Sequence, residues 1–216
     1  EIIKANPNRR IVVASAPGKR YKDDIKVTDM LYGCYNLAST GYPYEEELAA
    51  IEARFREILE ELGMDEPGAE FDLASEIEVI RAHLAGTPEK EYMASRGEYL
   101  NSKILAAYLG FRFLDAAECV RFTESGEPLP EVTNDLLGAA LKGEDSNAKA
   151  VPYTVLPGFY GADEKGTIHT FSRGGSDVSG SLAARAVGAD LYENWTDVSG
   201  MLETDPRIVK DPKPID

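Results

Sequence analysis

Residues 167–187 read TIHTFSRGGSDVSGSLAARAV, in which a short apolar run passes through paired glycines into a run of small residues. This pattern predicts a strand at Thr167–Phe171 that turns directly into a helix at Val178–Val187. Paired glycines allow a tight turn that brings backbone N–H groups close to a ligand, and the N-terminal end of the following helix favours an anion. For this segment taken alone, an ordinary glycine-rich turn with a serine cap is an equally good interpretation.

The alternation of strands and helices extends over the chain. Ile11–Ala14 is a short β-branched run, typical of a strand buried on both faces. Apolar spacing and glycine or proline positions predict helices at Tyr44–Leu62, Leu73–Leu84, from after Pro88 to Leu109, and at Leu136–Lys142, and strands at Phe111–Phe113, Val120–Phe122, Val151–Leu156 and Asp190–Trp195. Strands interleaved with helices predict an α/β three-layer sandwich with a largely parallel central sheet, in which ligands bind beyond the carboxyl ends of the strands.

Composition excludes several classes of partner. The 216 residues contain 23 Lys and Arg against 38 Asp and Glu, which gives a formal net charge of −15. A chain this acidic is poorly suited to bind nucleic acid or an anionic membrane surface, and no apolar stretch approaches the roughly 20 residues of a membrane helix. The two cysteines, Cys34 and Cys119, are expected to be reduced and buried in a cytosolic protein, with a single disulfide as the less favoured alternative.

A series of short segments gives the sequence its most specific signal. In chain order these are VASA at 13–16, SRGE at 95–98, PGFYG at 157–161, TFSRGGSD at 170–177, WTDVSG at 195–200 and TDPRIV at 204–209. Together they closely resemble the motifs of the aspartate kinases of the amino acid kinase family, in the family's order and over nearly the whole chain. Chance explains one such segment but not an ordered series.

The resemblance implies a reaction that needs no acid–base relay. Such a kinase transfers a phosphoryl group from ATP to the side-chain carboxylate of L-aspartate, which gives 4-phospho-L-aspartate at the entry to lysine, threonine and methionine biosynthesis. A carboxylate nucleophile is already ionised at neutral pH, so catalysis consists of aligning two anions and neutralising the charge of the transferring group. The resemblance therefore implies ATP and Mg²⁺ as cofactors, and a cytoplasmic enzyme whose full-length form is a homo-oligomer.

The resemblance also assigns roles to residues at matching positions. Arg173, which would clamp a carboxylate of aspartate, and Asp177 are the expected catalytic residues, while Glu98 would hold the ammonium group. The expected substrate-binding residues are Ser15, Thr28, Glu98, Phe159, Gly161, Arg173, Ser176 and Asp177, and the expected nucleotide-binding residues are Thr196, Asp197, Leu202 and Arg207. No metal site made by the protein alone is expected, with Asp177 or Asp197 as outer partners of Mg²⁺ on the nucleotide.

Two parts of the family's pattern have no counterpart in the chain. No glycine-rich segment with a phosphate-contacting lysine precedes Ile11, and the chain stops shortly after Arg207. We therefore expect residues 1–216 to be a partial catalytic domain, incomplete at both ends and without regulatory domains, with little or no kinase activity of its own. The charged loop Lys19–Lys26 is expected to be a solvated surface loop, with a mobile lid as the alternative.

Other functions stay open at this point. One alternative is another amino acid kinase, acting on acetylglutamate, carbamate or a nucleoside monophosphate. A second is a truncated kinase fragment that binds ligand without turnover. A third is a structural α/β protein, in which Arg173, Glu98 and Asp177 would not come together.

Overall fold

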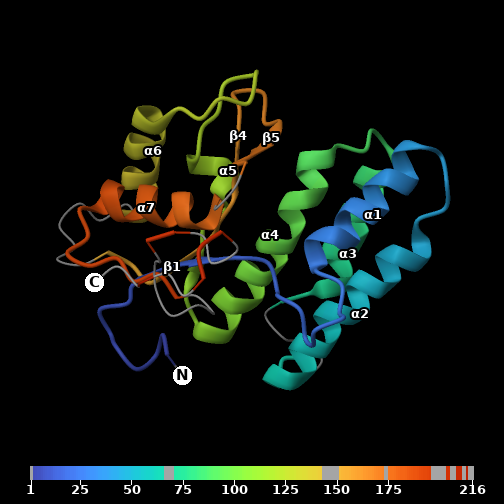
Figure 1. Cartoon of the computed structure of the whole chain (residues 1–216), viewed down its shortest axis with the longest axis horizontal. Helices are drawn as coiled ribbons and strands as arrows, with labels where there is room; N and C mark the ends of the chain where they lie inside the picture. The colour runs from blue at the N-terminus through green and yellow to red at the C-terminus, as the bar shows by residue number, and fades with distance from the viewer. Residues whose placement is uncertain are drawn as a thin grey trace.

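The structure is a computed structural model and describes residues 2–65, 71–142, 151–172, 175–195, 203–204, 208–210 and 213. Helix α4 (Lys90–Leu109) runs through the middle of the molecule, with three helices on one side and the strands on the other (Figure 1). The three helices are α1 (Val27–Ser39), α2 (Glu45–Leu62) and α3 (Leu73–Ala85). The other elements are β1 (Ile11–Ala14), β2 (Arg112–Phe113), α5 (Ala116–Cys119), α6 (Pro130–Lys142), β3 (Thr154–Pro157), β4 (Tyr160–Ala162), β5 (Ile168–Thr170) and α7 (Gly175–Val187).

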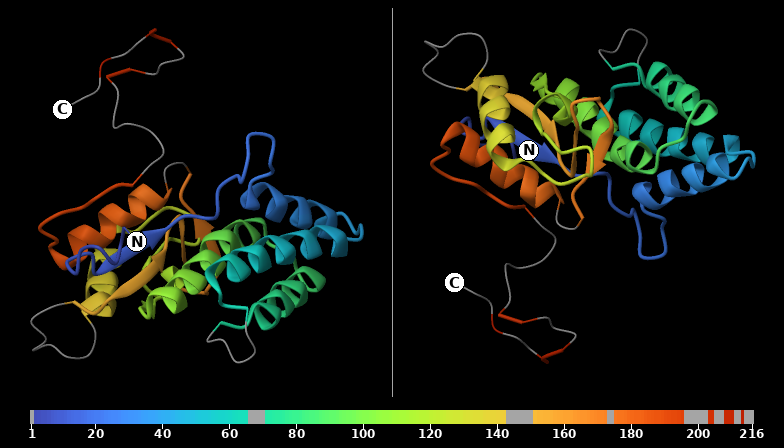
Figure 2. Two further views of the ribbon diagram at one scale, coloured as in Figure 1. Left: turned by 90° about the horizontal axis from the view of Figure 1, so that it is seen from below. Right: turned by 90° about the horizontal axis from the view of Figure 1, so that it is seen from above.

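The central sheet has the strand order β1-β3-β2, and both strand pairs are parallel. Helix α4 packs against β3 and β2, while α7 packs against β1. Figure 2 shows β1 and β3 side by side, with α7 on one side of them and α4 on the other. Strands β4 and β5 form a separate antiparallel pair. The predicted α/β sandwich with a largely parallel sheet is confirmed.

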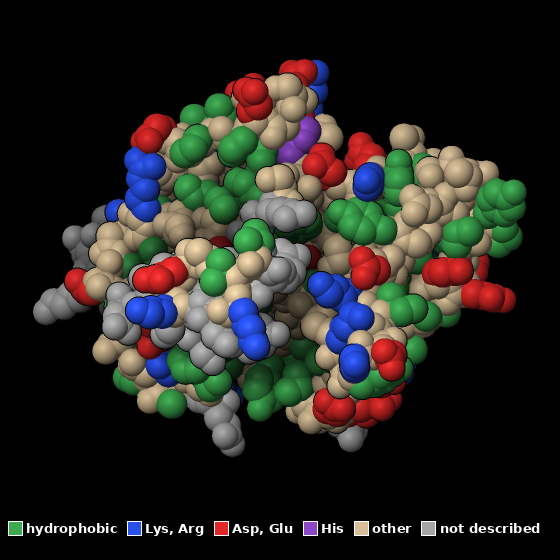
Figure 3. Space-filling view, viewed as in Figure 1, with side chains coloured by type: hydrophobic (Ala, Val, Ile, Leu, Met, Phe, Trp, Pro, Cys, Tyr) green, Lys and Arg blue, Asp and Glu red, His purple; other side chains and the backbone are tan. Residues whose placement is uncertain are grey.

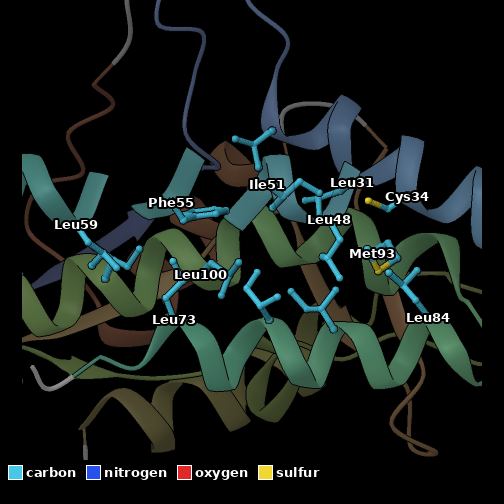
Figure 4. Close-up of a cluster of buried hydrophobic side chains, with 14 of the residues drawn as sticks. Leu31, Cys34, Leu48, Ile51, Phe55, Leu59, Leu73, Leu84, Met93 and Leu100 are labelled. Atoms are coloured by element: carbon cyan, nitrogen blue, oxygen red, sulfur yellow. The ribbon is translucent and has the colours of Figure 1, made fainter. Parts of the chain in front are cut away.

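The helical side of the molecule encloses its own hydrophobic core. Along α2, buried Leu48, Ile51, Phe55 and Leu59 recur at the spacing that places them on one helix face, and they meet α3 and α4 (Figure 4). Helix α2 ends at Gly63, which adopts the left-handed conformation that glycine accepts without strain. A second core lies between the sheet, the β4–β5 pair, α6 and α7.

Several predicted elements agree with the structure. The helices predicted at Tyr44–Leu62 and Leu73–Leu84, and the one ending at Leu109, are confirmed as α2, α3 and α4. The strand at Ile11–Ala14 is β1. The helix predicted at Leu136–Lys142 begins earlier, at Pro130, because proline fits the first position of a helix, where its missing N–H has no intrahelical partner.

Other expectations differ from the structure. Helix α1 was not expected, although its buried residues Val27, Leu31 and Cys34 have helical spacing. The strand predicted at Asp190–Trp195 is wrong: this segment is irregular and leaves most of its side chains exposed. β-propensity alone does not make a strand where no neighbouring strand supplies hydrogen bonds. Val120–Phe122 contributes isolated bridges rather than a strand, and the short helix α5 precedes it.

Both cysteine thiols are buried and are not joined to each other, as predicted from the sequence. Burial raises the pKa of Cys34 and of Cys119 to about 12, so both stay protonated thiols at neutral pH. Within the described residues, no helix has the length and apolar character needed to cross a membrane.

Gly161 in β4 lies against the backbone of Val120, which directly follows α5. A Cβ at this position would lie 2.4 Å from the carbonyl oxygen of Val120, which accepts a hydrogen bond from the backbone N–H of Ala162 at 3.0 Å. The carbonyl cannot move away without losing that bond. The requirement for glycine at position 161 is therefore explained by close backbone packing inside the fold.

We expect Gly161→Ala to lower the free energy of unfolding by about 1–3 kcal/mol, because the added methyl group overpacks a hydrogen-bonded backbone. Gly33→Ala is a matched control, since a Cβ at Gly33 in α1 would meet nothing within 4 Å. Removing a glycine from a helix interior should stabilise the protein by about 1 kcal/mol. Urea unfolding followed by circular dichroism measures both variants, and equal stability of the two would contradict this account of Gly161.

Candidate active site

Glu98 is a buried carboxylate in the middle of α4. Only 7% of the residue is exposed, and its Oε2 atom has no hydrogen-bond partner within the described residues. Burial raises the pKa of this carboxyl to about 7, while the backbone N–H groups of Ala16 and of Glu98 itself act in the opposite direction. Buried polar atoms in proteins are nearly always paired. A group that donates a hydrogen bond, such as an ammonium group, would satisfy this oxygen.

The loop that follows β1 packs directly on this part of α4. A Cβ at Gly97 would lie 2.9 Å from the Cβ of Ala16, so the loop comes this close only because position 97 carries no side chain. One turn further along α4, the Asn101 amide donates a hydrogen bond to the carbonyl oxygen of Ser15 at 2.7 Å. Glycine inside a helix costs about 1 kcal/mol relative to alanine. The close approach of the loop explains why position 97 is nevertheless glycine.

The same loop also reaches the start of α7. The Ser15 hydroxyl donates a hydrogen bond to the Ser176 hydroxyl at 2.8 Å. Gly158, directly after β3, lies beside them, since a Cβ there would be 2.7 Å from Ser176 Oγ. The segments that follow β1 and β3 therefore meet the N-terminal end of α7 at the carboxyl end of the sheet, where the strand-end rule places ligands.

Phe159 adopts a strained backbone conformation at this junction. Its φ of 78° lies in the left-handed region, which costs a bulky residue roughly 1–3 kcal/mol. The conformation is held from both sides: the Phe159 N–H donates to Ser179 Oγ at 3.1 Å, and its carbonyl accepts from the Phe171 N–H at 2.8 Å. Its ring also lies against Gly175, where a Cβ would be 2.7 Å from it. Strain retained in this way is frequent at functional sites.

Asp177 lies in the first turn of α7 and is exposed. Its Oδ1 accepts a hydrogen bond from the Asn194 amide at 3.2 Å. This contact ties the start of α7 to the irregular segment that precedes residue 196. Asp177, the expected catalytic carboxylate, directly follows Ser176 and is accessible to solvent.

The loop between β1 and α1 is attached to α2 by ion pairs. Asp24 is buried and pairs with Arg20 at 2.9 Å, and this guanidinium and backbone N–H groups hold the pKa of Asp24 well below its usual range. Arg54 of α2 is also buried and donates to the Gly18 carbonyl at 2.9 Å. As expected from the sequence, residues 19–26 form a solvated surface loop, in which Lys19, Arg20, Lys22 and Lys26 are exposed. Its contacts with α2 in addition anchor it to the protein.

The structure places the other expected residues as follows. Thr28 lies in the first turn of α1, next to Val27, whose side chain lies 3.5 Å from a Cβ built at Gly97. Gly161 lies in β4 against Val120, so its place in the wall of the substrate site stays a prediction. The expected residues Arg173, Thr196, Asp197, Leu202 and Arg207 lie outside the described residues.

Sequence reasoning missed Asn101 and Gly158 as structural parts of the site. Nothing in the spacing of α4 distinguishes Asn101, because its role depends on a loop that is 86 residues away in sequence. Gly158 is part of a recognised segment, but its approach to Ser176 could not be deduced from the segment itself. Both histidines have structural surroundings: His83 stacks on Tyr92, and His169 lies between Asp163 and Glu91.

The arrangement combines an unpaired negative charge with hydroxyl donors and a helix N-terminus. Glu98 suits an ammonium group, while Ser15, Ser176 and the N-terminal end of α7 suit an anion. Figure 3 shows basic side chains together near the middle of one face, where the β1–α1 loop runs in Figure 1. A small zwitterion fits these opposite charges better than a purely apolar or purely anionic molecule.

Comparisons with known proteins give one consistent result. A model of the amino acid kinase family matches residues 1–216. Aspartokinase 3 of Bacillus subtilis is 36% identical over 99% of this chain and 48% of its own length. The crystal structure of Clostridium acetobutylicum aspartate kinase matches with a TM-score of 0.83 and 42% identity, over 98% of this chain and 46% of that one.

A third match is informative because of its ligands. Escherichia coli aspartokinase III, in a structure with aspartate and ADP, matches with a TM-score of 0.69 and 27% identity, over 100% of this chain and 48% of that one. The chain therefore spans about half the length of each of these three proteins.

Glu98→Gln tests whether burial raises the pKa of the Glu98 carboxyl, and the measured quantity is the free energy of unfolding. Because the folded-state pKa is raised from 4.5 to about 7, the protonated carboxyl favours folding at low pH, and this contribution is lost as the pH rises through about 7. Glutamine carries no such charge. We expect the free energy of unfolding of the variant, relative to the unsubstituted protein, to rise by up to about 3 kcal/mol between about pH 5 and about pH 8.

The measurement is urea unfolding at both pH values. Glu46→Gln provides the control, since Glu46 lies on α2 with an exposed side chain, and its difference from the unsubstituted protein should be the same at both pH values. A pH-independent difference for Glu98→Gln would contradict the raised pKa.

Proposed function

The chain belongs to the amino acid kinase family, and from that premise we propose that it forms the aspartate-binding part of an aspartate kinase. Such an enzyme transfers the γ-phosphoryl group of ATP to the side-chain carboxylate of L-aspartate. We propose that residues 1–216 are part of its catalytic domain. Regulatory domains, a homo-oligomeric whole protein and a cytoplasmic location remain predictions from the resemblance.

The observation that carries this proposal is the unpaired Oε2 atom of Glu98. It lies on the helix turn that contacts the Ser15–Ala16 loop, within a site whose other polar groups favour an anion. The ammonium group of an amino acid would satisfy this oxygen and offset the cost of burying its charge. The aspartate in the Escherichia coli relative's structure supports the same choice of ligand.

In the proposed reaction, a side-chain carboxylate oxygen of aspartate attacks the γ-phosphorus. A P–O bond forms as the bond to the ADP oxygen breaks, so the products are 4-phospho-L-aspartate and ADP. No proton has to be removed from the nucleophile, since an aspartate carboxylate is ionised at neutral pH. The protein's contribution is therefore to hold the substrate in line and to balance charge. Glu98 would fix the amino end, Ser15 and Ser176 would border the substrate, and Arg173 would clamp one of its carboxylates.

The nucleotide side of the proposal rests on the family and on the ADP in the Escherichia coli relative. Thr196, Asp197, Leu202 and Arg207 are the proposed nucleotide-binding residues. Mg²⁺ would be held chiefly by phosphate oxygens and water, a ligand set that this ion favours, and would help to neutralise the transferring group. Asp177, an exposed carboxylate in the first turn of α7, fits the role of an outer partner, as does Asp197.

A second candidate function is another amino acid kinase activity, on acetylglutamate, carbamate or a nucleoside monophosphate. The buried carboxylate opposes these substrates, because none of them presents a free ammonium group to Glu98. Calorimetric titration of the chain with aspartate, N-acetylglutamate, carbamate and UMP separates the candidates. Binding of aspartate and ATP without release of ADP would mark the chain as a ligand-binding module.

Succinate provides a sharper test, because it keeps both carboxylates of aspartate and lacks the ammonium group. We expect the chain to bind L-aspartate at least about tenfold more tightly than succinate, the size of one charge-assisted hydrogen bond. Glu98→Gln should remove most of this preference by weakening aspartate binding alone. Glu46→Gln should retain it. Equal affinities of the unsubstituted chain for the two ligands would overturn the proposed role of Glu98.

The pH dependence of binding provides a separate prediction. Glu98 must be ionised to bind an ammonium group, and its pKa of about 7 in the protein without ligand means that the required form is scarce in mild acid. The affinity for L-aspartate should therefore increase between about pH 6 and about pH 8, while the affinity for succinate should not. Calorimetry in two buffers of different ionisation enthalpy should also detect proton release when aspartate binds near pH 6.

A further inference from the structure

Asn101 lies one helical turn after Glu98. Unlike the Glu98 carboxylate, the Asn101 side chain has a hydrogen-bond partner, in the loop that follows β1. The Nδ2 atom donates to the Ser15 carbonyl oxygen at 2.7 Å. Only the NH₂ end of the amide can make this bond, since a carbonyl oxygen accepts and does not donate. A side-chain donor on α4 therefore holds the first residue after β1.

Two more contacts come from the same part of α4. Gly97 leaves room for Ala16, whose Cβ would otherwise lie 2.9 Å from a new Cβ. The backbone N–H of Ala16 interacts with the Glu98 carboxylate and lowers its pKa. Neither contact fixes Ser15 directly. Of the three α4 residues, Asn101 is the one that binds the residue whose hydroxyl reaches Ser176.

The far end of the loop is held independently. Arg54 of α2 donates to the Gly18 carbonyl at 2.9 Å and lies 3.8 Å from Asp24. The loop is thus attached to α2 at Gly18 and to α4 at Ser15. If the attachment at Ser15 were lost, the loop would keep its contacts with α2 and the contact of Ala16 with Glu98, but Ser15 would be held less firmly against α4.

We propose that Asn101 is a positioning residue, which holds the Ser15–Ala16 loop against α4 and so sets the distance between the ammonium-binding carboxylate and the Ser15–Ser176 hydroxyl pair. Its effect on aspartate binding rests on the function proposed above, whereas its effect on the loop does not. Asn101 touches neither substrate nor reacting atoms in this role. It acts through Ser15, so its loss should weaken binding while the fold persists.

Two substitutions separate the hydrogen bond from the shape of the side chain. Asn101→Asp keeps the shape but replaces the donor with an acceptor that faces a carbonyl oxygen, and Asn101→Ala removes the side chain. Ser102→Ala is the matched control on the same helix turn, since the buried Ser102 hydroxyl has no hydrogen-bond partner within the described residues. Removing an unpaired buried hydroxyl should leave both the loop and ligand binding unchanged.

The first readout is hydrogen–deuterium exchange of the full 216-residue chain without ligand. We expect exchange in the peptide that covers residues 15–18 to accelerate about threefold to tenfold in both Asn101 variants, which corresponds to the loss of one hydrogen bond. Exchange in α4 should change less than exchange in residues 15–18, and the melting temperature of the Asn101 variants should fall by no more than about 2–4 °C, the size of one hydrogen bond. In Ser102→Ala, exchange in residues 15–18 should stay unchanged and the melting temperature should not fall, because the variant removes a buried hydroxyl without a partner in the described residues. Unchanged exchange in residues 15–18, or acceleration spread evenly over α4 and the cores, would overturn the proposal.

The second readout is calorimetric affinity for L-aspartate. We expect a loss of about threefold to tenfold in Asn101→Ala, at least as large a loss in Asn101→Asp, and none in Ser102→Ala. Unchanged affinity in both Asn101 variants would overturn the role of the loop in the substrate site. If the unsubstituted chain failed to bind aspartate, the proposed function would fail, and the exchange experiment alone would decide whether Asn101 positions the loop.

Discussion

Helix α4 is packed on both sides, and much of the structure depends on this constraint. Its residues Tyr92 and Tyr99 contact both hydrophobic cores, so the middle of the helix has no face left for solvent. Polar side chains there are buried together with the apolar ones. The Arg96 guanidinium is stabilised by the rings of Tyr92 and Tyr99, at 4.3 Å and 4.2 Å from their centroids. Glu98 on the same helix has no cationic or aromatic partner of this kind. Backbone N–H groups compensate its burial only in part, and its Oε2 atom has no hydrogen-bond partner in the described residues.

The charge of the whole chain says little about the charge at this site. The formal net charge is −15, but exposed charges more than about 10 Å apart are largely screened at physiological ionic strength. Acidic and basic side chains are interspersed over the face shown in Figure 3. The groups that set the charge at the candidate site are local: the Glu98 carboxylate, two serine hydroxyls and the N-terminal end of α7. An acidic protein can therefore provide a position for an anion next to one for a cation.

Close backbone packing, rather than the number of side-chain contacts, sets the geometry of the site. Gly97, Gly158 and Gly175 each adjoin another segment so closely that a Cβ would lie less than 3.0 Å from a neighbouring atom. Phe159 is held in a left-handed conformation by hydrogen bonds to Ser179 and Phe171. Segments packed this closely have little room to move relative to one another.

The sequence by itself determined the α/β architecture, the bounds of α2, α3 and α4, and the order of the motifs, because these depend on local periodicity, on glycine stops and on short segments. It also contained the helical spacing of Val27, Leu31 and Cys34 in α1, which was not recognised. The strand predicted at Asp190–Trp195 was wrong, because strand formation needs a partner that local propensity cannot supply. The resemblance grouped Ser15, Glu98 and Ser176 as expected substrate-binding residues. Only the tertiary structure shows that Ser15 contacts Ser176, and that the loop after β1 packs on Gly97 and accepts a hydrogen bond from Asn101. These relations join residues that are far apart in the chain, through distances and buried, unpaired atoms that exist only once α4 is enclosed by both cores.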